Sequence, residues 1–196
     1  MTQTPDEKQN PDNKPIDVLI AEDNRLQAKI LEDRLIRAGY RVRVGRDGAE
    51  ALRLAREQRP DIIVSDIEMP IMTGHELCRA IKSDEELRTV PLILLSTLSE
   101  PQDIIRGLDC GADNYVTKPY RPEYLMSRME SLLQTPLGSQ DEERLELEVT
   151  LSGNLYKVRS GRQQVLNLLV STFENAVEKN FELLRYNEEL TIAKEQ

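Results

Sequence analysis

The chain has 196 residues and a formal net charge of -9, with 39% hydrophobic and 31% charged residues. This length suits one full-sized domain with an appendage, or two small domains. The acidic balance argues against a nucleic-acid partner, because phosphate contacts require clustered Lys and Arg.

The N-terminal stretch and the cysteines indicate a cytoplasmic protein without a membrane segment. Residues 1–15 have neither a basic n-region nor an apolar h-region and are expected to form a disordered lead-in. No apolar run approaches the roughly 20 residues that cross a bilayer. Cys78, in a predicted helix, and Cys110, at a helix end, are the only two cysteines, and we expect reduced, partly buried thiols.

Residues 16–135 alternate between short apolar runs and amphipathic segments. Five runs predict strands, at residues 16–23, 40–45, 60–66, 90–97 and 113–119. Helices are expected to begin at Arg25, Gly48, Gly74, Pro101 and Arg121. The first, third and fourth strands are apolar on both faces, whereas RVRV alternates as an edge strand does. This pattern predicts an α/β fold with a doubly wound parallel sheet.

Polar residues stand where these predicted strands end. In such sheets ligands bind beyond the carboxyl ends of the strands, near the point where strand order reverses. We therefore expect these side chains to converge at one edge of the sheet. They are Glu22, Asp23, Asp66, Ser96, Thr97 and Lys118.

The chemistry of these residues predicts a site for a divalent cation and a phosphoryl group. Crowded carboxylates repel one another unless a cation lies among them, and Mg²⁺ prefers oxygen ligands while recruiting phosphate oxygens. Lys118 can neutralise a phosphoryl oxygen, and the Ser96 hydroxyl can donate a hydrogen bond to another. Asp66, which lies centrally, can attack phosphorus as a carboxylate nucleophile.

Four motifs in this region, AEDN, VSDIEMPIMTG, LLST and CGADNYVTKP, resemble those of the receiver domain of two-component response regulators. The resemblance covers residues 16–135 and implies a flavodoxin-like sheet with strand order 2-1-3-4-5. It also implies a histidine kinase or phosphotransfer protein as partner, and a phosphorylated switch rather than an enzyme.

The resemblance assigns the acidic residues to phosphorylation and metal binding. Asp66 matches the phospho-acceptor. Asp23, Asp66 and the backbone carbonyl of Glu68 match the ligands of Mg²⁺, and Glu22 would act on the metal through water. Ordinary helix-start acids are the alternative reading of Glu22 and Asp23.

The resemblance assigns the remaining strand ends to the phosphoryl group and the switch. Ser96 and Lys118 would contact the phosphoryl group, although the family often has Thr in place of Ser96. The peptide bond between Lys118 and Pro119 matches one that is commonly cis. Tyr115 matches an aromatic switch residue that turns inward when the Ser96 hydroxyl is drawn to the phosphate, and ordinary packing is the alternative.

His75 is the only histidine in the sequence. It follows Gly74 at the expected start of a helix and lacks the pattern of a kinase phosphoacceptor helix. We therefore expect a surface residue.

The pattern changes after Pro136. Residues 136–160 read as a linker and a β-hairpin, with RLELEVTL and LYKVRS joined by the turn residues SGN. Ser160 and Gln163 have the spacing of a capping box that opens a long helix, residues 161–196.

This C-terminal helix carries a heptad seam that predicts a coiled coil. The seam residues alternate at spacings of three and four: Leu166, Leu169, Phe173, Ala176, Asn180, Leu183, Asn187 and Leu190. Asn180 and Asn187 fall at a positions, where facing amides favour a parallel homodimer in register. Phe181, at a b position, does not fit the seam. The alternative is a helix that packs back on the α/β domain.

The leading interpretation is a receiver that passes its phosphorylation state through the hairpin and dimeric helix to a downstream output. No output motif follows the receiver. One alternative is therefore that the chain is an N-terminal piece of a hybrid sensor kinase. Another is that its output is a protein partner that binds the coiled coil. A phosphatase of the haloacid dehalogenase type also uses an Asp nucleophile, but Glu68 stands where that family has Asp. A flavin binder would require a glycine-rich loop where AEDNRLQ stands.

Overall fold

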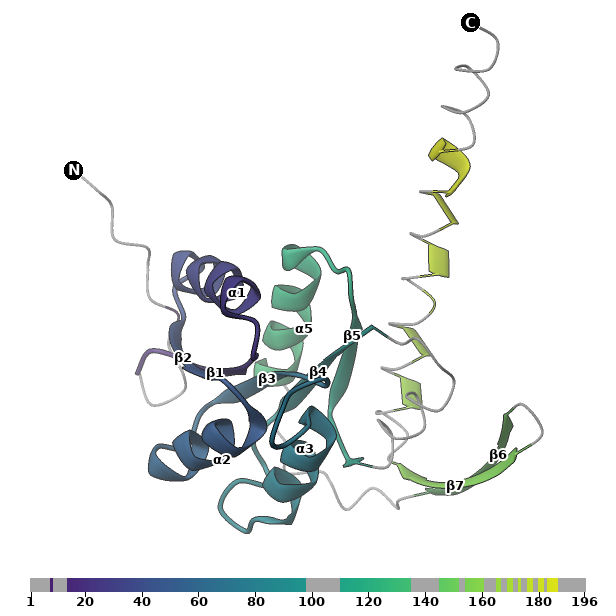
Figure 1. The fold of residues 1–196 in the computed structure, drawn as a ribbon, viewed down its shortest axis with the longest axis horizontal. Coiled ribbons are helices and arrows are strands. Elements are labelled where there is room, and N and C mark those ends of the chain that lie inside the picture. Colours follow the sequence, from purple (N-terminus) through teal and green to yellow (C-terminus); the bar gives the residue numbers. More distant parts are fainter. Residues whose placement is uncertain are drawn as a thin grey trace, which may run out of the picture.

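A five-stranded parallel sheet forms the centre of the protein in the computed structural model (Figure 1). The strand order is β2-β1-β3-β4-β5, as expected, with β2 at one edge. The strands are β1 (Asp17–Ala21), β2 (Arg41–Gly45), β3 (Ile62–Asp66), β4 (Leu92–Ser96) and β5 (Asn114–Thr117).

The structure describes residue 8, residues 14–97 and 110–134, and the backbone of residues 145–151 and 154–160. In the C-terminal helix it describes residues 165, 166, 169, 170, 173, 176, 177, 180, 181 and 183–186. The expected helix beginning at Pro101 lies outside these residues, as does the expected capping box, because Gln163 is not described.

Helices cover both faces of the sheet. One face carries α1 (Arg25–Arg37) and α5 (Pro122–Gln134), and the other carries α2 (Gly48–Glu57) and α3 (Gly74–Ser83) (Figure 1). Each of these four helices begins within one residue of its expected start. The prediction of a doubly wound α/β fold is confirmed.

The central strands are buried on both faces, as their apolar runs predicted. In β1, Val18 and Ile20 join the core beneath α1 and α5, whereas Leu19 and Ala21 join the core beneath α2 and α3. Successive side chains of a strand point to opposite faces, so a continuous apolar run fills two cores at once. This double packing holds the carboxyl ends of β1 and β3 in fixed positions.

The loop after β3 is pinned by the start of α3. The Thr73 side chain accepts from the backbone of Glu76, whose side chain accepts in turn from the Thr73 backbone, which completes a capping box. The Gly74 amide donates to the Ile67 carbonyl at 3.0 Å. A side chain at Gly74 would collide with the Asp66 carbonyl oxygen, so only glycine permits this close approach.

The predicted β-hairpin after the sheet domain is confirmed at the level of the backbone. β6 (Leu145–Leu151) and β7 (Asn154–Ser160) pair antiparallel, with Val149 opposite Tyr156. β6 ends at Leu151 and β7 begins at Asn154, so the two strands flank the position of the expected SGN turn.

The described positions of the C-terminal helix are exposed along most of their length. Leu166, Leu169, Phe173 and Leu183, four of the expected seam residues, are 54–70% exposed. Ala176 and Asn180 are also exposed, whereas Asn187 and Leu190 lie outside the described residues. The helix runs away from the sheet domain (Figure 1). Only Val165, at its start, packs against the core beneath α2 and α3 among the helix residues that the structure describes.

The N-terminal lead-in differs from the expected disorder at its described residues. The Lys8 ammonium forms an ion pair with Glu130 of α5, donates to the Tyr40 hydroxyl at 3.1 Å and lies 4.6 Å from the centre of the Tyr40 ring. Its backbone also bonds to Gly39 and Ile16. One basic residue in a polar stretch thus finds an acidic and an aromatic partner that composition does not reveal.

Two other expectations concern single residues. His75 is buried, at 9% exposure, so the expectation of a surface residue is wrong. The close approach of Gly74 to the β3 loop brings the adjacent His75 into the interior. Cys78 and Cys110 are reduced, as expected, but they are fully rather than partly buried.

Among the described residues, no helix combines the length and apolar character that a membrane crossing requires.

Candidate functional site

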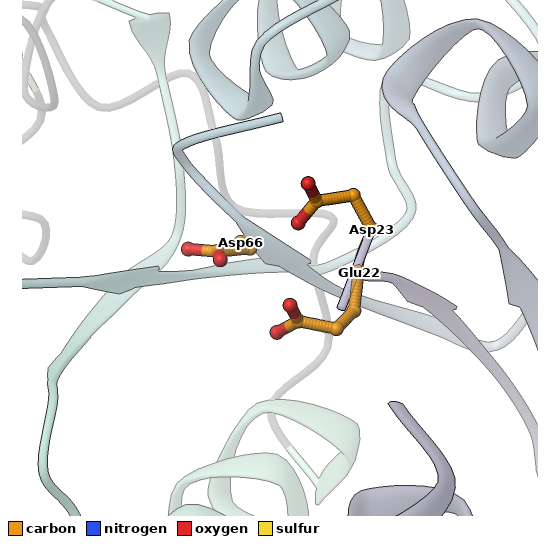
Figure 2. Close-up of side chains that lie close together, drawn as sticks. All are labelled: Glu22, Asp23 and Asp66. Atoms are coloured by element: carbon orange, nitrogen blue, oxygen red, sulfur yellow. The ribbon is translucent and has the colours of Figure 1, made fainter. Parts of the chain in front are cut away.

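The predicted site residues do meet at the carboxyl edge of the sheet. Glu22 and Asp23 follow β1, and Asp66 is the last residue of β3. Ala21 pairs with Ser65, so the next residues along the two strands, Glu22 and Asp66, are neighbours. Figure 2 shows the three carboxyl side chains gathered at these strand ends.

The three carboxylates are close enough to share one cation. One oxygen each from Glu22, Asp23 and Asp66 lies within 4.8 Å of the others. Asn24, rather than either acid, caps α1 by accepting from the amides of Leu26 and Gln27. Both acids still stand next to the start of α1, where the helix dipole favours negative charge, so that role is compatible with metal binding.

Lys118 reaches into this acidic cluster from the end of β5. Its ammonium donates to Asp66 Oδ2 at 2.9 Å and to Glu22 Oε2 at 3.2 Å. The side chain is 17% exposed, so these contacts are only partly screened by water. The Lys118–Pro119 peptide bond is cis. Three carboxylates against one ammonium leave two negative charges uncompensated, the charge that one divalent cation balances.

The electrostatics of Glu22 and Lys118 reflect this excess of negative charge. Burial raises the pKa of Glu22, and the Asp66 charge adds to the rise, although the Lys118 charge opposes it. Burial by itself would lower the pKa of Lys118, but the bonds and charges of Asp66 and Glu22 outweigh it and raise that pKa. Lys118 therefore remains protonated at neutral pH, and an ionised Glu22 is destabilising until a cation joins it.

Replacing Glu22 with Gln is expected to stabilise the metal-free protein at neutral pH, by about 1 kcal/mol. A raised folded-state pKa means that the folded protein binds the Glu22 proton more tightly than the unfolded chain does. The wild type therefore loses stability as pH rises from the ordinary value of 4.5 through the raised value. Urea unfolding in a chelator at neutral and acidic pH measures the difference, which should vanish below 4.5.

The exposed Glu57, which pairs with Arg53 on the surface of α2, is the matched control for that substitution. Glu57→Gln should change stability little at either pH, because exposed ion pairs contribute little. A Glu22→Gln protein that is less stable than the wild type at neutral pH would contradict the assignment of Glu22 as a strained acid.

The other oxygen of Asp66 is held by the backbone. Asp66 Oδ1 accepts from the Ile67 amide at 2.7 Å, while Oδ2 faces Lys118. Ser96 ends β4 and is 3% exposed, and its carbonyl accepts from the Lys118 amide at 2.6 Å. This bond joins the end of β4 to the residue that follows β5, at the carboxyl edge of the sheet.

Tyr115 lies inside the core, not at the surface. It is 1% exposed, and its hydroxyl lies 3.6 Å from Cys110 Sγ. Burial raises the pKa of Tyr115 well above its usual value, so the hydroxyl stays protonated. The ring is thus part of the core beneath α2 and α3.

One residue of the site was not predicted. Gln27, in the first turn of α1, accepts from the Lys118 ammonium at 3.1 Å. No motif marks Gln27, since it joins the site only because the Lys118 side chain extends from the end of β5 to the first turn of α1. The Glu68 side chain is exposed, which is compatible with a role for its backbone carbonyl alone.

A family model described as "Response regulator receiver domain" matches residues 18–130. The chain belongs to this family. The signal receiver domain of a signal transduction histidine kinase from Syntrophus aciditrophicus is 42% identical, with a TM-score of 0.58, and the match covers 69% of this chain and 98% of that one.

The chain is also similar to a second receiver structure and to a curated regulator. The receiver domain of sensor histidine kinase PA1611 from Pseudomonas aeruginosa PAO1 is 31% identical, with a TM-score of 0.58, over 61% of this chain and 98% of that one. Its structure has a magnesium ion coordinated in the active site cleft. A probable transcriptional regulator, ycf27, from Guillardia theta is 35% identical over 76% of this chain and 57% of its own length. This receiver chain thus spans less than two thirds of that relative.

Proposed function

We propose that the protein is a signalling switch in which Asp66 accepts a phosphoryl group from a histidine kinase or phosphotransfer protein. The observation that carries the proposal is the clustering of Glu22, Asp23 and Asp66 with their oxygens within 4.8 Å, and with the Lys118 ammonium 2.9 Å from Asp66. Membership of the receiver family supports it.

The donor set fits Mg²⁺, which takes oxygen ligands and keeps several waters. Asp23, Asp66 and the backbone carbonyl of Glu68 would hold the ion, and Glu22 would act through water. When bound, Mg²⁺ neutralises the charge of the carboxylates and of the incoming phosphoryl oxygens. The magnesium ion in the PA1611 receiver structure supports this assignment.

Each residue of the site has a separate role in phosphoryl transfer. The Ile67 amide holds Asp66 Oδ1, which orients the carboxylate, and one Asp66 oxygen forms the new bond to phosphorus while the donor's bond to phosphorus breaks. Lys118 can pass from Asp66 Oδ2 to a phosphoryl oxygen without leaving the site, because Gln27 and Glu22 hold its ammonium nearby. The Ser96 hydroxyl would bind another phosphoryl oxygen.

The proposed switch links Ser96 to Tyr115. Movement of the Ser96 hydroxyl toward the phosphoryl group would favour the inward ring of Tyr115, on the adjacent strand β5. Ser96 and Tyr115 lie on paired strands, since Leu94 pairs with Tyr115 and Ser96 with Thr117. The ring is already buried in the structure, so phosphorylation would shift an existing equilibrium.

Intact mass measurement after incubation with acetyl phosphate and Mg²⁺ tests the phosphorylation. The full chain should gain one phosphoryl group, whereas Asp66→Asn, or the wild type in excess chelator, should gain none. Asp23→Asn should retain the acceptor but lose most of the labelling. Labelling of the Asp66→Asn protein, or repeated turnover of diverse phosphate esters, would contradict the proposal and favour a phosphatase.

The signal is proposed to leave through the C-terminal helix. Val165, where the helix is first described, packs against the same core cluster as Tyr115. The exposed apolar seam beginning at Leu166 would bury itself in a parallel dimer of two chains, with Asn180 aligning the register. Movement at Tyr115 could thereby reach the paired helices.

The proposed organisation is a lead-in (1–15), a receiver domain (16–135), a linker with a β-hairpin (136–160) and a dimerising helix (161–196). A specific observation also favours the second candidate, in which the chain is the receiver part of a larger hybrid sensor kinase. The matched receiver from Syntrophus aciditrophicus comes from a signal transduction histidine kinase. In that case the paired helices would lead into the kinase part.

A further inference from the structure

Cys78 and Cys110 form a buried dithiol that the proposed phosphorylation does not use. Cys78 lies in α3, and Cys110 lies five residues before Tyr115 of β5. The Cys78 thiol donates to the Cys110 carbonyl at 3.2 Å, and both side chains belong to the core cluster beneath α2 and α3. They are 0% and 3% exposed. Two cysteines from distant parts of the sequence therefore lie in contact within the core.

The two sulfurs have different surroundings. The pKa of Cys110 is lowered, first by the hydrogen bond from Cys78, and further by the Tyr115 hydroxyl and the Ala112 amide, although burial opposes the shift. The pKa of Cys78 is raised well above its usual value by the bond with Cys110 and by burial. Cys110 is thus the better nucleophile, and Cys78 is the thiol that keeps its proton.

Cys110 is also the more accessible of the two sulfurs. Gly111, which follows it, is only partly buried and has a positive φ of 84°. The nearest side chain to an added Cβ at Gly111 is that of Lys82, at 3.6 Å. Cys110 is 3% exposed and Cys78 is 0% exposed, so a small oxidant meets Cys110 first.

We propose that Cys78 and Cys110 form a reversible disulfide when the protein meets a small hydroperoxide. The Cys110 thiolate attacks the peroxide, the O–O bond breaks, and a sulfenic acid forms on Cys110 while the alcohol leaves. The Cys78 sulfur then attacks the Cys110 sulfur, the S–O bond breaks, and water leaves with the Cys78 proton. In sum, two thiols are oxidised by two electrons, and the hydroperoxide is reduced to an alcohol and water.

Oxidation would change the environment of Tyr115. Its hydroxyl contacts Cys110 Sγ at 3.6 Å, and a disulfide sulfur can no longer serve as a charged acceptor for that hydroxyl. The disulfide would also tie α3 to the segment that leads into β5. A link from oxidation to the phosphorylated state rests on the proposed switch role of Tyr115, whereas disulfide formation does not.

Treating the full chain with hydrogen peroxide, then alkylating it with N-ethylmaleimide under denaturing conditions, tests the proposal. Intact mass should show loss of two hydrogens and loss of both alkylation sites, and a reductant should restore them. Protease fragments should place the bond between Cys78 and Cys110 within one chain. Two alkylatable thiols after treatment, or a bond only between chains, would overturn the proposal.

Single substitutions test the order of attack. In Cys78→Ser, dimedone, which traps sulfenic acids, should label Cys110, whereas in Cys110→Ser it should leave Cys78 unlabelled. Labelling of Cys78 in the second variant would overturn the assignment of Cys110 as nucleophile. The fragment mapping uses the wild type, so it decides the disulfide even where a variant fails to fold. Acetyl phosphate labelling of reduced protein, run in parallel, separates failure of this site from failure of Asp66 phosphorylation.

Discussion

Replacing Lys118 with Ala is expected to slow the phosphorylation of Asp66 by acetyl phosphate about 100-fold, the usual effect of removing one preorganised donor from a reacting oxyanion. The Lys118 ammonium is held 2.9 Å from Asp66 and 3.2 Å from Glu22, so it is already placed where phosphoryl charge gathers. A time course of the phosphorylated mass at saturating Mg²⁺ measures the rate.

Lys29 provides a matched control on α1. Its ammonium also contacts two carboxylates, Glu32 and Asp33, each at 3.0 Å, but the side chain is 61% exposed. Lys29→Ala should therefore leave the phosphorylation rate unchanged. Equal slowing in both variants would indicate a general loss of positive charge, and a normal rate in Lys118→Ala would remove Lys118 from the mechanism.

Slow phosphorylation of Lys118→Ala could come from loss of the ammonium alone or from a collapsed site, and magnesium binding distinguishes these two causes. The variant keeps all three carboxylates of the cluster, so calorimetric titration should show that it still binds Mg²⁺. Loss of a positive charge beside the site should not weaken the attraction for a cation. A variant that loses both metal binding and phosphorylation would point to a collapsed site.

Replacing Leu183 with Glu is expected to weaken dimerisation of the full chain at least about 100-fold, equivalent to ~3 kcal/mol. Leu183 occupies a d position of the proposed parallel seam and is 60% exposed in the single chain. In a parallel dimer in register, the two introduced carboxylates would face each other in a dry interface, where unpaired like charges are strongly unfavourable. Light scattering or sedimentation over a dilution series measures the dissociation constant.

Phe181 is the control for this seam. It is 64% exposed, close to the value for Leu183, but it stands at a b position outside the proposed interface. Phe181→Glu should therefore dimerise as the wild type does. The reverse pattern, with Phe181→Glu disruptive and Leu183→Glu neutral, would show that another face of the helix makes the contact. A wild-type chain that remains monomeric at high concentration would reject the dimer itself.

The apolar face of this helix is wider than the seam alone. Val170, Val177 and Leu184, at e positions, are 42%, 38% and 58% exposed. Helices with apolar a, d and e positions suit bundles, whereas strict a and d patterns suit two-stranded coiled coils. The dilution series thus also reports whether association stops at two chains.

Most of the sheet and its polar edge could be predicted because they depend on local patterns. An apolar run such as residues 92–95 must be covered on both faces, which requires a parallel sheet with helices on each side. Parallel strands place their carboxyl ends at one edge, so Glu22, Asp66 and Lys118 had to converge once the strands were recognised. The β-hairpin followed from alternation and turn residues in the same way.

The remaining features depend on contacts between segments that no local pattern connects. Gln27 joins the site, Lys8 docks on Tyr40, and His75 is buried only because of how helices and loops are placed around the sheet. Side chains of this kind carry no periodicity that reports their partners.

The two cysteines show most clearly which features follow from local sequence patterns and which depend on tertiary contacts. The order of residues was enough to predict two thiols, one in a helix and one at a helix end, in a chain that folds as a receiver with acids at one edge of its sheet. The contacts of Cys78 with Cys110, and of Cys110 with Tyr115, became known only from the folded chain. Strand and helix patterns specify which face of each element is buried, whereas the packing of α3 against the segment before β5 specifies which buried atoms meet.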